Sequence, residues 1–129
     1  MRRVPKPTDA ELEVLRVLWE RGASTVRDIH AVVDQHKTRG YTTILKTVQI
    51  MTDKGLVTRD TSSRSHVYRP RFTESQTQQQ LIRDLVDRAF GGSAAKLMLQ
   101  VFGTKPATPE ELSELRALLK ERRRQRDGE

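Results

Sequence analysis

Residues 40–71 read GYTTILKTVQIMTDKGLVTRDTSSRSHVYRPR, and this stretch decides the fold. Three apolar residues recur in its first half at the spacing of a helix: Ile44, Val48 and Met51. Gly55 follows at the position just past a helix end, where glycine is favoured. The first half therefore predicts one helix, residues 42–54, with a single apolar face.

Two short strands are predicted directly after that helix. Residues 56–59 and 66–69 are rich in strand-forming side chains, and the polar residues 60–65 form a turn between them. We expect Tyr68 to pack this hairpin onto the rest of the domain. Helix, strand, turn and strand in this order predict a recognition helix followed by a wing, which is an arrangement that reads DNA.

Two further helices are predicted upstream of this stretch. Thr8 and Glu11 have the spacing of a capping box at the start of the first. Ser24 or Thr25 caps the second, which carries valines and an isoleucine at helical spacing. Three helices followed by a two-stranded ribbon predict a mostly α fold with a small β wing, a winged helix-turn-helix over residues 8–72.

The chain changes character after the wing. Apolar stripes predict helices at residues 72–90, at residues 94–102 and from Thr108 onward, and we expect the tail, residues 122–129, to fray. Hydrophobic residues make up only 35% of the chain, so part of the apolar surface should be covered by a second copy. Residues 73–129 are therefore predicted to form a C-terminal helical dimerisation arm, and a helical cap folded back on the same chain is the alternative. The predicted dimerisation residues are Leu81, Leu85, Leu97, Val101, Phe102, Leu112, Leu115 and Leu119.

The net charge of +7 is distributed unevenly along the 129 residues. Residues 35–71 hold eight Lys and Arg against Asp53 and Asp60, whereas residues 73–129 hold ten basic against nine acidic residues. The excess lies on the predicted helix and wing, which indicates an anionic partner, double-stranded DNA. A solvated basic face with no partner is the alternative.

The predicted recognition helix presents a polar face opposite its apolar one. Turning it by 100° per residue points Thr42, Lys46 and Gln49 outward, with Thr43 on the flank. The threonines stand in the first turn, where phosphate binds readily, and Lys46 and Gln49 are suited to guanine and adenine edges. The predicted DNA-binding residues, with the wing included, are Arg39, Thr42, Thr43, Lys46, Gln49, Arg59, Arg64 and His66.

Several function classes lack support in the sequence. Cysteine is absent, which excludes disulfides and thiolate metal sites. The three histidines show no metal-ligand spacing, and neither a phosphate-binding glycine loop nor a nucleophile motif occurs. Residues 1–7 form a basic arm without a following apolar segment, and no apolar run reaches the length of a membrane span. We expect a cytoplasmic protein that is not an enzyme, needs no cofactor or metal and does not insert into membranes.

Two other classes of function stay open at this point. A winged helix can dock its basic face on an acidic protein partner, and the C-terminal helices would then bind that partner. A ligand-sensing regulator would need an apolar pocket between its domains. Steep salt dependence together with discrimination between DNA sequences separates a DNA-reading protein from a protein-interaction module.

The sequence YTTILKTVQIMTDKGLV followed by RSHVYRP resembles the penicillinase-repressor family, the BlaI/MecI type of winged-helix transcriptional regulators. TDAELEVLRVLWERGASTVRDIH and FGGSAAKLMLQVF with TPEELSELRALL resemble the family's other helices, so the likeness extends over most of the chain. It implies a homodimer that represses transcription on a palindromic operator with TACA/TGTA-like half-sites. It also implies DNA contacts by Thr42, Thr43, Lys46 and Arg64.

The resemblance further implies a mode of induction. In the antibiotic-resistance members a membrane sensor-protease signals induction, and the repressor is cleaved at an Asn-Phe bond in its C-terminal arm. The corresponding bond here joins Gln100 to Val101, so both residue types differ. Copper-responsive relatives carry C-terminal Cys-x-Cys pairs, and this chain has no cysteine with which to bind copper in that way.

Overall fold

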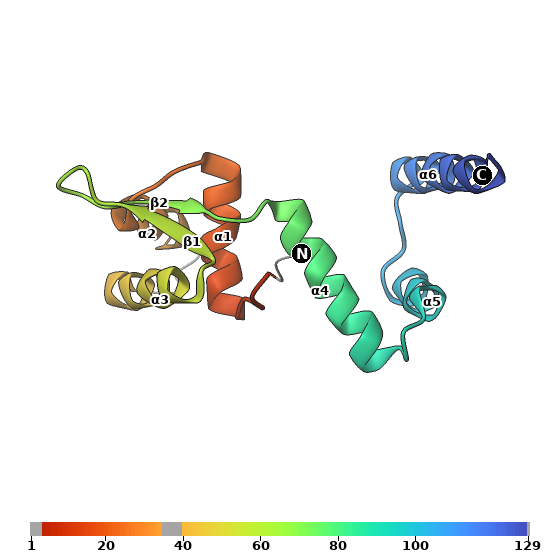
Figure 1. Cartoon of the computed structure of the whole chain (residues 1–129), viewed down its shortest axis with the longest axis horizontal. Helices are drawn as coiled ribbons and strands as arrows, with labels where there is room; N and C mark the ends of the chain where they lie inside the picture. The colour runs from red at the N-terminus through yellow and green to blue at the C-terminus, as the bar shows by residue number, and fades with distance from the viewer. Residues whose placement is uncertain (1–3, 35–39, 129) are drawn as a thin grey trace. The chain divides into compact units, whose positions relative to one another are not determined.

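The computed structural model describes residues 4–34 and 40–128. The elements follow in the order α1 (Asp9–Arg21), α2 (Val26–Asp34), α3 (Tyr41–Lys54), β1 (Val57–Asp60), β2 (Val67–Pro70), α4 (Glu74–Ala89), α5 (Ala94–Thr104) and α6 (Pro109–Asp127) (Figure 1). β1 and β2 pair in antiparallel fashion. The mostly α class with a small β wing is confirmed, as is the order of a winged helix-turn-helix.

The chain forms two compact units, Met1–Asp84 and Leu85–Glu129, and the division falls within α4. The domain boundary predicted from the sequence lies earlier, between residues 72 and 73. The first unit contains the three-helix and hairpin arrangement, and the second contains α5 and α6.

The core of the first unit is built from one apolar face of each of α1, α2 and α3. Ile44, Val48 and Met51 of α3 have no exposed surface, which confirms the predicted apolar face. Truncating one such side chain to alanine typically costs about 2–5 kcal/mol of stability. The other members of this core include Val14, Leu15, Leu18, Ile29, Leu56 and Tyr68.

Side-chain caps begin the first two helices. The Glu11 N–H donates to Thr8 Oγ1 at 3.2 Å and the Thr8 N–H donates to Glu11 Oε1 at 2.8 Å, so the predicted capping box is confirmed. Thr25, rather than Ser24, caps α2. The Thr25 N–H donates to Asp28 Oδ2 and the Asp28 N–H donates to Thr25 Oγ1, both at 3.1 Å.

The strands of the wing lie one residue further along the chain than predicted. Gly55 adopts the left-handed conformation, with φ of 82°, at the end of α3. The Leu56 N–H then donates to the Met51 carbonyl at 2.9 Å, so Leu56 belongs to the helix cap rather than to the strand. The register pairs Val57 with Pro70 and Asp60 with Val67.

Ser24 ties the wing to the helices. Its N–H donates to the Tyr68 carbonyl at 3.1 Å, and the Tyr68 N–H donates to the Ser24 carbonyl at 2.8 Å. β2 is therefore bonded on one edge to β1 and on the other to the segment between α1 and α2. The Tyr68 side chain is 2% exposed, which confirms that it packs the wing onto the body.

The end of α3 is held to the start of α1 by an ion pair. Lys54 Nζ lies 2.7 Å from Glu11 Oε1, and it also donates to the Lys6 carbonyl at 3.3 Å. Glu11 is almost fully buried, so its carboxylate depends on the Thr8 N–H and on Lys54 for charge-stabilising contacts. Trp19, only partly buried, donates from Nε1 to the Phe72 carbonyl at 3.1 Å.

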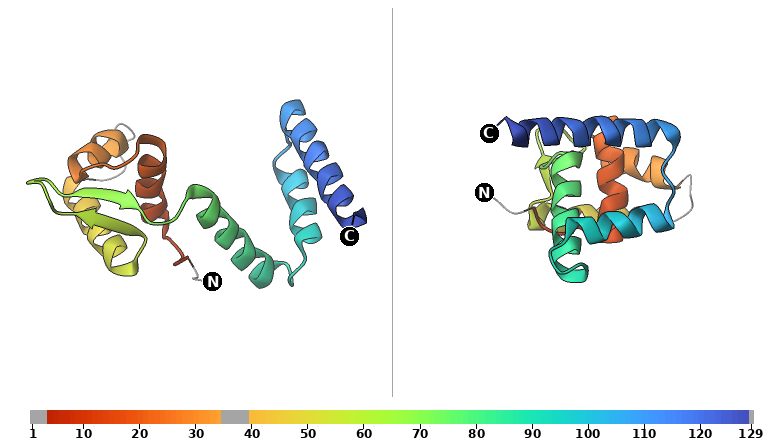
Figure 2. Two further views of the ribbon diagram at one scale, coloured as in Figure 1. Left: turned by 45° about the horizontal axis from the view of Figure 1, so that its top comes forward. Right: turned by 90° about the vertical axis from the view of Figure 1, so that its right-hand side faces the viewer.

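In the second unit α5 and α6 are joined by a short loop, and the two helices stand apart in Figure 1 and in the right-hand view of Figure 2. Ser93 caps α5, and Thr108 with Glu111 forms the capping box predicted at the start of α6. The prediction that residues 122–129 fray is wrong for the residues described, because α6 continues as a helix to Asp127. Residues 122–126 are all Arg or Gln, which have good helix propensity, and no glycine interrupts the helix before Gly128.

The ion pair at the end of α3 gives a stability prediction. Lys54→Met leaves the buried Glu11 carboxylate with the Thr8 N–H alone, so unfolding in urea should require about 1–3 kcal/mol less free energy. Lys96→Met on the exposed surface of α5 is the matched control and should change stability by under about 0.5 kcal/mol. Equal stability of the two variants would contradict the importance of this pair.

Candidate nucleic-acid interface

The outward face of α3 carries the polar residues that the sequence analysis assigned to it. Thr42, Thr43, Lys46 and Gln49 are all exposed, on the side of the helix away from the buried stripe. Within the described residues the Lys46 ammonium has no ion-pair partner. Its charge and the Gln49 amide are therefore free to contact an external ligand.

The first turn of α3 begins without a side-chain cap. Gly40 is the N-cap residue, and it has no side chain with which to accept a hydrogen bond from the first N–H groups. These N–H groups and the exposed hydroxyls of Thr42 and Thr43 together offer hydrogen-bond donors at the positive end of the helix dipole. This combination suits a phosphate oxygen.

The tip of the wing is ordered by its own hydrogen bonds. The Ser62 N–H donates to Asp60 Oδ1 at 2.9 Å, and Ser63 Oγ donates to the Ser65 carbonyl at 2.8 Å. Hydrogen bonding by the Ser62 side chain and then by its N–H holds the pKa of Asp60 below the ordinary value of 3.8, and the charge of Arg69 lowers it further. Arg64 stands exposed at this tip.

The remaining predicted contact residues occupy different places. Arg59 is exposed in β1 opposite Tyr68, so it lies on the hairpin face that packs against the helices. His66 is exposed just before β2. Arg39 lies outside the described residues.

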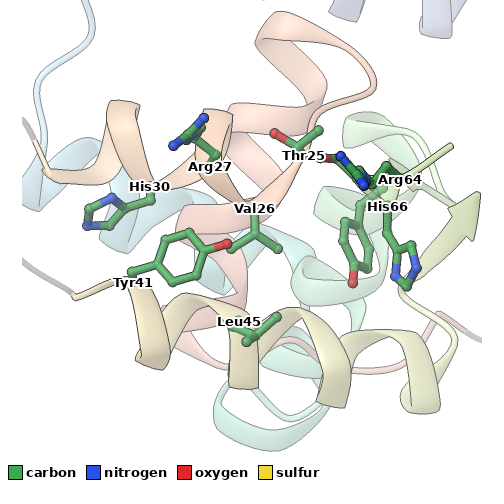
Figure 3. A pocket seen from close by; sticks show the side chains of 10 residues that line it. Thr25, Val26, Arg27, His30, Tyr41, Leu45, Arg64 and His66 are labelled. Atoms are coloured by element: carbon green, nitrogen blue, oxygen red, sulfur yellow. The ribbon is translucent and has the colours of Figure 1, made fainter. Parts of the chain in front are cut away.

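An open cleft of about 540 Å³ lies where the starts of α2 and α3 meet the wing (Figure 3). The rings of His30 and Tyr41 make an edge-to-face contact at one end, with centroids 5.7 Å apart. Arg64 and His66 line the cleft from the wing. The complete lining is Thr25, Val26, Arg27, His30, Tyr41, Leu45, Arg64, Ser65, His66 and Tyr68.

Sequence reasoning missed the part of this cleft that α2 and the start of α3 contribute. Arg27 follows the cap of α2, and Tyr41 is exposed at the first residue of α3. The capping pattern around Thr25 located the start of α2, but no local signal told which face of that helix the wing would approach. The Ser24–Tyr68 pairing brings the wing to the start of α2, and the packing of α2 on α3, with the His30–Tyr41 ring contact, brings Tyr41 to the same place.

The predicted dimerisation residues differ in how far their side chains are buried. Leu85, Val101, Phe102, Leu112 and Leu119 are exposed large apolar side chains. Leu81 and Leu115 are half-buried, whereas Leu97 is buried within the described chain. A cleft of about 580 Å³ between α5 and α6 is lined partly by Met98, Phe102, Leu115 and Leu118.

In the part of the chain that the structure describes, there is neither a candidate metal site nor a helix that could span a membrane. No group of three His, Cys, Asp or Glu residues there is placed to hold a metal ion. No helix among residues 4–34 and 40–128 has the length and apolar character needed to cross a membrane. Gln100 and Val101, at the bond implied for proteolysis, are both exposed within α5.

Comparison with known proteins shows to which family this chain belongs. The model of the penicillinase repressor family matches residues 7–121. The chain belongs to the penicillinase repressor family. It is 25% identical over 121 residues to the penicillinase repressor of Bacillus licheniformis, which is 94% of each chain.

Solved structures of the penicillinase repressor family match the first unit. The solution structure of the DNA-binding domain of the repressor BlaI has a TM-score of 0.51 and 28% identity, covering 59% of this chain and 93% of that one. The Bacillus licheniformis BlaI monomer in complex with the blaP half-operator matches with the same TM-score, identity and coverage. The winged-helix fold predicted from the sequence is confirmed.

The hydrogen bonds at the wing tip give a pH prediction. The pKa of Asp60 is lowered in the folded state, so its stabilising contribution is present above the unfolded value and is lost as the pH falls below 3.8. The stability difference between the wild type and Asp60→Asn should therefore be constant above about pH 5 and shrink in acid. An Asp60 pKa at or above 3.8 in an NMR titration would contradict this account.

Proposed function

We propose that this protein is a sequence-specific DNA-binding transcriptional repressor that acts as a homodimer on a palindromic operator. The observation that carries the proposal is the division of α3 into a fully buried apolar stripe and an exposed face that carries Thr42, Thr43, Lys46 and Gln49. An exposed helix of this kind fits the major groove of DNA. Membership of the penicillinase repressor family supports the same function.

Residues of α3 have the chemistry to read base edges. Lys46 can donate to the O6 and N7 atoms of guanine, and the Gln49 amide can pair with adenine through one donor and one acceptor. Thr42 and Thr43 bind backbone phosphate at the helix start and set the register on the duplex. The 28% identical BlaI domain, solved with a half-operator, supports this use of the fold.

The cleft beside α3 supplies further phosphate contacts. Arg64 approaches it from the wing and Arg27 from α2, so two guanidinium groups line the cleft beside the recognition helix. A guanidinium binds a phosphate through two parallel hydrogen bonds. Arg59 and His66 add hydrogen-bond donors from the wing. Arg39 is the remaining residue that the sequence predicts to contact DNA.

The apolar surface of the second unit supports a homodimer. Exposed Leu, Val and Phe side chains on α5 and α6 form a surface that monomeric soluble proteins rarely leave uncovered. Residues 8–72 would then act as the DNA-binding domain and residues 73–129 as the dimerisation domain. Two α3 helices related by the dimer axis match two half-sites about one DNA turn, or a small multiple of it, apart.

The proposal assigns neither catalysis nor a cofactor to this chain. Repression would follow from occupying a promoter in the cytoplasm and blocking polymerase. The family resemblance implies a sensor-protease as the inducing partner, and the bond that corresponds to the family's cleavage site joins Gln100 to Val101, where both residue types differ from the family's. The alternative function is a winged-helix module that docks on an acidic protein.

Fluorescence anisotropy on two duplexes tests the proposal. One duplex carries a TACA/TGTA palindrome and the other a scrambled sequence, and both are titrated across a salt series. If six to ten phosphates are contacted, affinity should fall by about a thousandfold or more between about 50 and 200 mM salt. Tight binding to the palindrome alone supports a specific repressor, and absence of binding to either duplex favours the protein-interaction module.

Replacing Lys46 tests whether α3 reads bases. Lys46→Ala should reduce the preference for palindrome over scramble by about 1–3 kcal/mol, because a direct base contact is lost. Lys96→Ala, which removes the same charge from α5, should leave the preference unchanged. If Lys46→Ala weakened binding to both duplexes equally, Lys46 would be a phosphate contact instead.

Replacing Leu119 tests the dimer. This side chain is 67% exposed, so Leu119→Asp should leave each chain folded but shift the protein toward monomer in sedimentation velocity. Operator binding should weaken in parallel, because each half-site then binds independently. Ser113→Asp, an exposed position on the same helix, is the matched control, and a full dimer in both variants would refute the assigned surface.

A further inference from the structure

The last part of α6 differs in chemistry from the rest of that helix. Leu119 is its final apolar residue, and residues 120–127 read KERRRQRD. The helix nevertheless continues to Asp127, and every side chain from 120 to 127 is exposed. The family model ends at residue 121, so the four arginines lie beyond the part of the chain that matches it. These are Arg122, Arg123, Arg124 and Arg126, and we refer to them as the arginine segment.

Three of these arginines share one face of the helix. Arg122, Arg123 and Arg126 line a shallow surface hollow together with Leu119 and Asp127. Positions three and four apart are neighbours on a helix, so the three guanidinium groups form a contiguous basic patch. Within the described residues no carboxylate pairs with any arginine of this segment. With three arginines against Asp127, the patch therefore carries net positive charge.

We propose that the arginine segment binds the phosphate backbone of the same DNA that the first unit reads, as a second, sequence-independent contact. This inference rests on the proposed function, because binding of DNA by α3 tethers the segment to the same duplex through the chain. Once α3 is bound, the effective concentration of nearby DNA at a tethered site is in the millimolar range. A weak electrostatic contact then adds measurably to affinity.

The dimensions and chemistry of the segment suit this ligand. Residues 122–127 span about 9 Å at 1.5 Å per residue. A duplex presents about five phosphate charges over that length of its axis. Arginine also offers the planar, two-pronged donor geometry that phosphate oxygens accept best.

An anionic membrane is a poorer match. A helix that lies on a lipid surface needs an apolar face to enter the acyl boundary. Residues 120–127 contain no apolar side chain, so they offer charge alone. The exposed leucines of α6 all precede this segment.

The experiment compares two full-length variants with equal loss of charge. In the first, all four arginines of the segment become glutamine. In the control, four exposed arginines on α1 and α4 become glutamine: Arg16, Arg21, Arg83 and Arg88. Binding is measured as a function of salt on a palindromic and on a scrambled duplex that both extend a full turn beyond the half-sites.

In the segment variant, the decrease of log affinity with log salt concentration should become less steep by about two to four units. Each phosphate contact that is lost means about 0.9 fewer counterions released on binding. The ratio of affinities for the two duplexes should stay at the wild-type value, and the control should keep its slope within about one unit. Arg126→Gln alone, near the helix end, should make the salt dependence less steep by about 0.9 units. This single variant serves as a control in case the fourfold variant folds or dimerises poorly.

A slope in both segment variants equal to that of the wild type would overturn the inference. So would segment-dependent binding to vesicles containing phosphatidylserine without any change in the DNA slope. If the wild-type protein bound both duplexes equally, the proposed specific repressor would fail, while the slope on the scrambled duplex would still decide the role of the segment. If it bound neither duplex, both proposals would fail.

Discussion

The rotation of α3 about its own axis is the constraint on which the rest of the molecule depends. Ile44, Val48 and Met51 are buried completely among α1, α2 and β1, and a rotation of the helix would expose them. Each of these side chains is worth a few kcal/mol, so the alternative rotations are inaccessible. Lys46 and Gln49 therefore point outward because other residues of the same helix must point inward.

The wing is fixed relative to α3 by a second set of contacts. Tyr68 inserts its side chain into the core and pairs its backbone with Ser24. This single residue places Arg64 beside the starts of α2 and α3. Lys54 and Glu11 hold the opposite end of α3 to α1. The polar face of α3 and the wing are consequently presented as one preformed surface, which limits the ordering cost of binding.

The fold was largely predictable from local sequence patterns because its elements begin and end with strong local signals. Thr8 with Glu11 and Thr108 with Glu111 mark helix starts, and Gly55 marks a helix end. The strands were placed one residue early, because the Leu56 N–H completes the cap of α3. The basic residues after Leu119 suggest a fraying end because they carry no apolar side chain to pack, yet arginine and glutamine are good helix formers and α6 continues through them.

The site was predictable where it depends on a single helix and not where it depends on contacts distant in sequence. The outward position of Lys46 follows from helical periodicity. The contribution of Arg27 and Tyr41 to the cleft depends on the packing of α2 against α3 and on the pairing of Ser24 with Tyr68, two residues separated by more than half of the first unit. The Glu11–Lys54 pair joins residues 43 positions apart, and the sequence explains Glu11 fully as a capping residue without it.

The central claim is that the exposed face of α3 and the wing form the DNA-contacting surface. The most direct test follows backbone amide resonances of the labelled protein by NMR while a palindromic duplex is added. The account predicts that the largest shifts occur at Thr42, Thr43, Lys46 and Arg64, with the outer face of α1 unaffected. Shifts concentrated on α1, with α3 and the wing unchanged, would contradict it.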